Sequence, residues 1–232
     1  MGGMVLNPRA AVDAVASLAE PTRRRVYELV ARARRGLTRD DVTEATGLPR
    51  TTAAFHLDRL VEEGLLSVGF ERRTGRTGPG AGRPSKVYSR SDASVAVSLP
   101  PRQYDLAAEL LAAAVEDADA TGQPVRTCLE RRAYAAGQAL GRPDVASALA
   151  DSGYEPYAQG DAIALANCPF HAVAGRHTDL VCGMNLHLVE GLLDAAGAAG
   201  LQARLDPSPG HCCVRIEPRA AGAAEAPEPH RG

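Results

Sequence analysis

The sequence predicts an α+β protein. Apolar residues recur at helical spacing through most of residues 11–63, and two short strand-like runs follow at residues 65–71 and 86–89. From residue 154 onward, helical and strand-like patterns alternate. With 232 residues, 45% of them hydrophobic and 23% charged, the chain is long enough for two modest domains, each with its own core.

Charge is distributed unevenly along the chain. Residues 21–90 contain 15 Arg and Lys against 8 Asp and Glu, a net charge of +7, whereas the rest contains 11 against 20, a net charge of −9. A basic third joined to an acidic remainder indicates that the first part meets a polyanion and the second does not. Charge alone leaves a solvated charged face as the alternative.

No stretch reaches the roughly 18 apolar residues of a membrane span. Residues 1–15 also lack the charged and apolar regions of a secretory signal. We therefore expect a cytoplasmic protein with no membrane partner. In that compartment we expect the five cysteines to be thiols or metal ligands rather than disulfides.

The first domain, residues 1–92, is predicted to contain four helices and two strands. Thr38 is a good N-cap, Gly47 makes a turn, and Pro49 suits the first position of the next helix. The strands are joined by RRTGRTGPGAGRPS, which has too much glycine for regular structure. Two helices joined by a tight turn and followed by a two-stranded wing make a winged helix-turn-helix. The helices are expected at residues 11–18, 22–33, 39–45 and 49–63.

Three segments of this domain resemble ArsR-type winged-helix repressors. They are LAEPTRRRVYELV, LTRDDVTEATGLPRTTAAFHLDRLVEEGLL and GRPSKVYS, and the resemblance covers about residues 14–90. It implies a transcriptional regulator, most simply a repressor, that binds double-stranded operator DNA. In relatives the region around His56 lies at the DNA surface, but Ala54 and Phe55 here replace more polar residues.

The helix that begins near Arg50 is the predicted reading helix, because a helix fits the major groove and its N-terminal half reaches base edges. Arg50 and Thr51 are expected to contact bases, Phe55 a thymine methyl group and Arg59 a phosphate. The arginines of the wing suit phosphate or minor-groove contact, with a solvated loop as the alternative. The predicted DNA-binding residues are Arg50, Thr51, Thr52, Phe55, His56, Arg59, Arg73, Arg76, Arg83 and Lys86.

The remainder is expected to begin with a helical dimerisation segment, residues 102–142, since a second copy must supply the second DNA half-site. A mixed α/β domain, residues 150–217, and a disordered tail, residues 218–232, follow. Within these parts, helices are predicted at residues 104–117, 126–140, 169–175 and 179–195, and strands at residues 162–166, 201–205 and 212–216.

Cys168, Cys182, Cys212 and Cys213 all lie in the last third of the chain. Their spacing is too wide for a zinc knuckle, but folding can bring them together. Cys168 precedes a helix and Cys182 lies about one turn into the next, positions that favour the thiolate. On a regular strand only one of the adjacent pair faces a given site. Taken singly, each cysteine is more often a small buried hydrophobe.

This arrangement resembles the iron–sulfur-sensing repressors of cluster-assembly operons. The resemblance implies a homodimer in which residues 150–217 form a sensor domain and cluster occupancy sets operator affinity. Cys168 and Cys182 match two ligands, and Cys212 or Cys213 the third. The fourth is the other of that pair, a histidine, or a group outside the protein; the candidate histidines are His171, His177, His187 and His211. We expect a [4Fe–4S] cluster in preference to a [2Fe–2S] cluster, and a structural role for Cys128.

Two alternatives remain open. The second domain could instead sense a small molecule, zinc or thiol oxidation. An enzyme with Cys168 or Cys182 as nucleophile fits less well, because no base with an orienting partner is visible and the DNA-binding domain would be unexplained. We therefore expect no catalytic residues.

Overall fold

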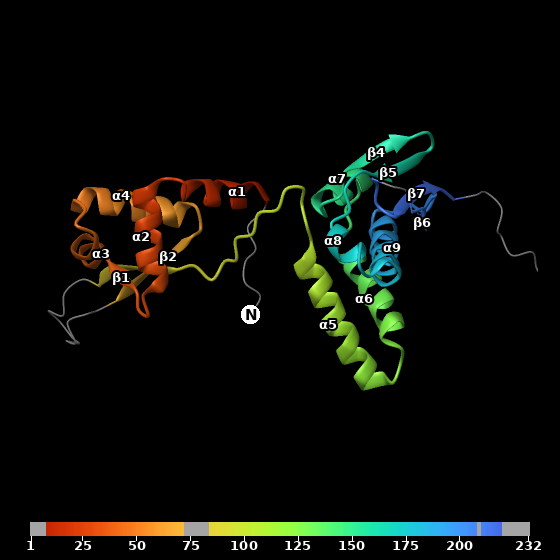
Figure 1. Ribbon diagram of the computed structural model, residues 1–232, viewed down its shortest axis with the longest axis horizontal. Helices are drawn as coiled ribbons and strands as arrows, with labels where there is room; N and C mark the ends of the chain where they lie inside the picture. The colour runs from red at the N-terminus through yellow and green to blue at the C-terminus, as the bar shows by residue number, and fades with distance from the viewer. Residues whose placement is uncertain (1–7, 72–83, 208–209, 220–232) are drawn as a thin grey trace, which may run out of the picture. The chain divides into compact units, whose positions relative to one another are not determined.

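The computed structural model describes residues 8–71, 84–207 and 210–219 (Figure 1). The chain divides into two compact units, residues 1–97 and residues 98–232, and each is described by itself. Within the described residues, no helix is long and apolar enough to cross a membrane.

The first unit packs four helices against a small sheet. Its strands lie in the order β1-β3-β2 with antiparallel pairing, and Tyr88 of β3 stands opposite both Leu37 and Val68. Each predicted helix and strand is present within a few residues of its expected bounds, while β1 was not predicted. The elements are α1 (Pro8–Ser17), α2 (Pro21–Arg32), β1 (Leu37–Thr38), α3 (Arg39–Thr46), α4 (Arg50–Glu62), β2 (Leu66–Glu71) and β3 (Ser85–Arg90).

Local sequence sets where α3 and α4 begin and end. The Thr38 side chain accepts a hydrogen bond from the backbone N–H of Asp41, and the Asp41 carboxylate accepts one from the backbone N–H of Thr38, so a complete capping box starts α3. Gly47 ends α3 with φ of 72°, a conformation that glycine adopts without strain. Pro49 then precedes α4. These signals place the two helices of the helix-turn-helix one tight turn apart.

The described part of the second unit combines helices of 4 to 18 residues with a four-stranded antiparallel sheet in the order β4-β5-β7-β6. In Figure 1, α5 and α6 form a helical hairpin and α9 lies beside α6. Neither α7 nor β4 was predicted, and the helix expected at residues 169–175 is only the short α8. The elements are α5 (Tyr104–Thr121), α6 (Val125–Leu140), α7 (Val145–Asp151), β4 (Pro156–Gln159), β5 (Ala162–Leu165), α8 (His171–Ala174), α9 (Thr178–Ala195), β6 (Leu201–Leu205) and β7 (Val214–Pro218).

Helices α6 and α9 approach each other unusually closely. A Cβ atom added at Gly137 of α6 would collide with the carbonyl group of Leu188, and one at Gly191 of α9 with the carbonyl of Tyr134. Glycine at both positions therefore permits the contact. Because α9 also packs against the sheet, residues 102–142 and 150–217 share one core instead of forming the separate segments expected from the sequence.

Candidate functional site

The N-terminal half of α4 presents exposed side chains. Arg50 and Thr51 are exposed, Thr52 is half-buried, and Phe55 is 61% exposed. The guanidinium Nε of Arg50 lies 3.1 Å from Oδ1 of Asp40 on α3, and both side chains face solvent. The opposite side of α4 buries Ala53, Leu57 and Leu60 in the core of the first unit. Four predicted DNA-binding residues thus lie on the accessible side of this helix or at its margin.

His56 lies on the other side of α4, which corrects the expectation that it faces DNA. It is 7% exposed, and its Nδ1 lies 3.6 Å from Oε2 of Glu20. Glu20 caps α2 by accepting hydrogen bonds from the backbone N–H groups of Thr22 and Arg23. Residues three and four apart share a helix face, so His56 follows the buried Ala53 inward. His56 therefore contributes to the packing of α2 against α4.

Arg59 and Lys86 are engaged in ion pairs within the first unit. Arg59 Nη1 lies 3.3 Å from Glu62 Oε2. Lys86 Nζ donates to Oδ1 of Asp58 at 2.6 Å, and this bond lowers the pKa of Asp58 and raises that of Lys86. Arg59 or Lys86 can bind a phosphate only by giving up its contact with a protein carboxylate.

Strands β2 and β3 form the hairpin that follows α4 in the chain. Phe70 stands opposite Lys86 in its register and is 70% exposed. The predicted wing residues Arg73, Arg76 and Arg83 lie outside the described residues.

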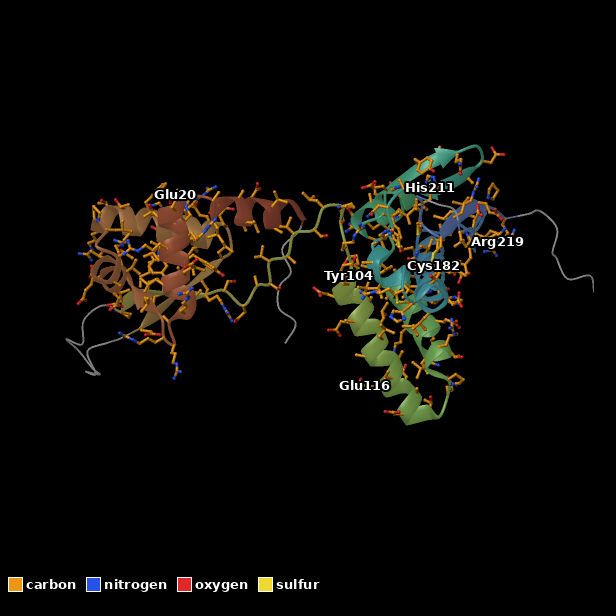
Figure 2. All side chains as sticks on the ribbon, viewed as in Figure 1. Glu20, Tyr104, Glu116, Cys182, His211 and Arg219 are labelled. Atoms are coloured by element: carbon orange, nitrogen blue, oxygen red, sulfur yellow. A yellow bond between two sulfur atoms is a disulfide. The ribbon has the colours of Figure 1, made fainter. Side chains whose placement is uncertain are left out.

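Four of the five cysteines gather in the second unit, and we call this set the cysteine centre (Cys168, Cys182, Cys212 and Cys213). Cys168 follows β5, Cys182 lies near the start of α9, and the other two directly precede β7. Cys168, Cys182 and Cys213 line one pocket of about 360 Å³. Figure 2 labels Cys182 and His211, both of which line this pocket. Residues separated by more than forty positions therefore meet at one site.

Cys182 and Cys213 are joined by a disulfide, with Cα atoms 6.3 Å apart. The expectation that every cysteine is a thiol or a metal ligand is wrong for this pair. The two lie 31 residues apart in sequence, and only the packing of α9 against β7 brings them together. Cys128, Cys168 and Cys212 are free and buried.

Cys212 contacts Cys168 and is held by a buried polar network. The Asn185 side-chain amide donates to the Cys212 sulfur at 3.2 Å and accepts a hydrogen bond from the Tyr154 hydroxyl. The hydrogen bond from Cys212 lowers the pKa of Cys168, and the same contact, together with burial, raises the pKa of Cys212. Burial also raises the pKa of Tyr154. Cys168 is therefore the thiol of this pair that ionises first.

Both members of the adjacent pair belong to the cysteine centre. The expected strand at residues 212–216 begins only at Val214, so alternation along a strand does not separate Cys212 from Cys213. The Cys212 N–H bonds to the Leu165 carbonyl at 2.9 Å, and the Cys213 carbonyl accepts from the Asp206 N–H at 2.8 Å. In this turn, the Cys212 side chain contacts Cys168 and the Cys213 side chain is bonded to Cys182.

The candidate histidines occupy different places. His171 and His211 line the pocket with the cysteines. His187 faces away on α9, with Nδ1 2.7 Å from Glu190 Oε2, and His177 is the N-cap residue of α9. Cys128 is fully buried on α6 in the core, as its expected structural role requires.

In the part of the chain that the structure describes, no group of three or more His, Cys, Asp or Glu side chains is arranged to hold a metal ion. Two of the four sulfurs at the cysteine centre are bonded to each other, which leaves Cys168 and Cys212 as its free thiols. The cysteine centre thus combines one disulfide with two free thiols.

Sequence reasoning did not identify three polar residues at this centre: Asn185, Asn167 and Arg102. Asn185 is 1% exposed and Asn167 is 6% exposed, and both are fully engaged in hydrogen bonds across distant segments. Asn185 interrupts an otherwise apolar stretch of α9, which is the one local signal that could have drawn attention to it.

Comparison with known proteins identifies the first unit. Residues 18–69 match the family model of a helix-turn-helix domain, which spans α2, α3, α4 and most of β2. No curated protein matches the chain. The domain match supports a helix-turn-helix transcriptional regulator that binds DNA.

Proposed function

We propose that the chain is a winged helix-turn-helix regulator, in which α4 reads the major groove and the β2–β3 hairpin serves as the wing. The exposed residues Arg50, Thr51 and Phe55 on α4 carry the proposal. The net charge of +7 over residues 21–90 favours a polyanionic partner. If the Arg50–Asp40 ion pair breaks on binding, the Arg50 guanidinium is free to donate to the two acceptors of a guanine, O6 and N7.

The DNA proposal is tested with a duplex selected from a random-sequence library by the full-length chain. Binding is measured by fluorescence anisotropy across a salt series. We expect affinity to fall steeply with salt, and Arg50→Ala to weaken binding by about 1–3 kcal/mol. Arg126→Ala, which removes an exposed arginine from the second unit, serves as the control. Recovery of no preferred sequence, together with equal affinities for Arg50→Ala and the control, would contradict the proposal.

We propose further that the cysteine centre binds an iron–sulfur cluster that controls DNA affinity. The observation that supports this is the convergence of Cys168, Cys182 and Cys213, from three separate segments, on one pocket, with Cys212 in contact with Cys168. Thiolates are the ligands that such clusters prefer, and the donor set fits that chemistry once the Cys182–Cys213 bond is reduced. Cys168, Cys182 and Cys213 would then hold the group from the pocket wall, with Cys212, His171 or His211 beside them.

Each protein group has a definite part in this site. Asn185 orients Cys212, and the lowered pKa of Cys168 favours its thiolate at neutral pH. A bound cluster supplies a redox-sensitive link between these segments, with [4Fe–4S] expected in preference to [2Fe–2S]. Its loss would free the segments that Cys168, Cys182 and Cys213 belong to.

Anaerobic reconstitution of the reduced chain with iron and sulfide tests the cluster. We expect a brown protein with broad visible absorption that air bleaches, and loss of that absorption in Cys168→Ser and Cys182→Ser. Cys128→Ala is the matched control, since this cysteine lies in the core away from the pocket. A colourless protein that retains zinc or an organic ligand would favour the small-molecule or zinc sensor instead.

We also propose a homodimer that pairs through α5. Beside its buried face, this helix carries an apolar stripe at helical spacing: Tyr104, Ala108, Leu111 and Val115. Val115 is 47% exposed, and Figure 2 shows Tyr104 and Glu116 near opposite ends of the helix. Light scattering should report a dimer that Val115→Glu dissociates and Ala120→Glu, on the opposite face, leaves intact. A monomeric wild-type chain would contradict this proposal.

A further inference from the structure

The segment that connects the two units is bound to the backbone at Cys168. Residues 98–103 lead from the first unit into α5. Arg102 Nη1 donates to the carbonyl oxygen of Cys168 at 3.0 Å and to the side-chain oxygen of Asn167. The backbone N–H of Gln103 donates to the Pro169 carbonyl at 3.1 Å. Two consecutive residues of the segment thus bond to two consecutive residues at the cysteine centre.

Asn167 adds further hydrogen bonds between the connecting segment and the backbone next to Cys168. Its side-chain amide donates to the carbonyl of Pro101 at 3.1 Å and to that of Gly153 at 2.6 Å. The residue is 6% exposed, so leaving these groups unpaired would cost free energy with no water to compensate. Asn167 therefore holds the connecting segment, the turn after α7 and the backbone of Cys168 in one arrangement.

Cys168 belongs to both the connection and the pocket. Its carbonyl accepts from Arg102, while its side chain lines the pocket with Cys182 and Cys213. A bond between the Cys168 sulfur and a metal restrains the same residue whose carbonyl holds Arg102. One residue thus joins the pocket to the connecting segment.

We propose that Arg102 and Asn167 couple the cysteine centre to the connecting segment, and through it to the DNA-binding unit. The inference rests on the proposed function, in that the centre binds a metal or a cluster. Arg102 is a positioning residue in this scheme: it contacts the backbone of a ligand residue and not the ligand itself. Coupling between two sites typically changes affinity by about 5- to 150-fold.

Hydrogen–deuterium exchange on the full-length chain tests the coupling at the segment itself. The chain is first reduced with dithiothreitol, which cleaves the Cys182–Cys213 disulfide. Exchange of the amides of residues 102–107 in the reduced chain is followed before and after anaerobic loading with iron and sulfide, and separately with cadmium ion, which also binds thiolates. In the wild type we expect loading to change exchange by about 5-fold or more, the lower end of usual coupling. In Arg102→Ala the chain should still load, but the exchange should no longer respond. Arg102→Lys, which keeps a charged donor, should restore part of the response.

Arg126→Ala is the matched control, because Arg126 Nη1 also donates to a backbone carbonyl of this unit, that of Asp179, at 3.0 Å. Its response should equal that of the wild type. A wild-type chain that responds to neither load, or an Arg102→Ala chain that responds fully, would overturn the proposal. Failure of both Arg102 variants to bind either iron and sulfide or cadmium would also overturn the proposal, since Arg102 would then belong to the binding site. A response to cadmium without cluster formation would support the coupling while refuting the proposed iron–sulfur function.

Discussion

At the scale of single residues, Asp58 shows how one carboxylate joins a helix to a strand. Its Oδ1 accepts from Lys86 at 2.6 Å and from the Tyr88 hydroxyl at 2.9 Å, and the Lys86 ammonium also lies 4.9 Å from the centre of the Tyr88 ring. Helix α4 is thereby fixed to β3, the strand that returns from the predicted wing. The same contact engages a lysine that the sequence predicts to bind phosphate.

Asp58→Asn should lower the free energy of unfolding at pH 7 by up to about 1 kcal/mol, because the ion pair is partly exposed and screened by solvent. Lys86 lowers the pKa of Asp58 below its ordinary value of 3.8. A carboxyl group with a lowered folded-state pKa stabilises the fold above its ordinary value and loses that effect as pH falls through the folded-state pKa.

Urea unfolding of both chains between pH 7 and pH 2 measures this difference. The difference between the two curves should begin to shrink below about pH 4 and disappear once pH is below the folded-state pKa, as the wild-type carboxyl group takes up a proton. A difference that stays constant down to pH 2 would show that Asp58 acts through shape and not through charge.

At the scale of elements, the contact between α6 and α9 organises the second unit. Gly137 and Gly191 bring the two backbones together, and α9 in turn carries Cys182 at its start and Asn185 one turn later. The depth at which α9 packs therefore determines where the cysteine centre forms. Helix α9 can therefore support the cysteine centre only while it stays in contact with α6.

Gly137→Ala should destabilise the second unit by about 1–3 kcal/mol, since the added methyl group would overlap the Leu188 carbonyl and force the helices apart. Gly183→Ala in α9 is the matched control. A Cβ atom there meets nothing closer than the Arg126 Nη1 at 3.8 Å, so the better helix propensity of alanine should stabilise by up to about 1 kcal/mol. Thermal unfolding followed by circular dichroism measures both, and equal effects in the two variants would refute the close-contact explanation.

At the scale of the whole molecule, the described residues form two separate cores. One core contains Val26, Leu57 and Tyr88, the other Leu129 and Leu188, and no residue belongs to both. The units should therefore unfold in separate transitions. Such an arrangement suits the proposed regulator, because the connecting segment links the unit with the cysteine centre to the unit with the helix-turn-helix.

Reduction of the Cys182–Cys213 disulfide should lower the unfolding free energy of the second unit by about 2–4 kcal/mol and leave the first unchanged, because the bond closes a loop within one core. Scanning calorimetry with and without dithiothreitol measures both transitions. The transition that Asp58→Asn shifts identifies the first unit. A shift of that transition on reduction would contradict the independence of the cores.

Much of the fold could be predicted from the sequence because its signals are local. The capping box of Thr38 and Asp41, the turn at Gly47 and the apolar stripe of α4 involve neighbours within one or two helical turns. Those signals predict the helix-turn-helix and the face of α4 that carries Arg50. They also placed most helices and strands within a few residues. The concentration of cysteines in the last third is read directly from the sequence.

Only the tertiary structure decided which groups meet. The contact of His56 with Glu20 depends on the packing of α2 against α4, the disulfide on the packing of α9 against β7, and the contact of Arg102 with Cys168 on segments 66 residues apart. Such contacts form because a shared core brings distant segments together, and no periodicity or spacing in the chain encodes them. Local sequence therefore determined the helix-turn-helix and supplied the cysteines, while packing decided how those cysteines pair and what they contact.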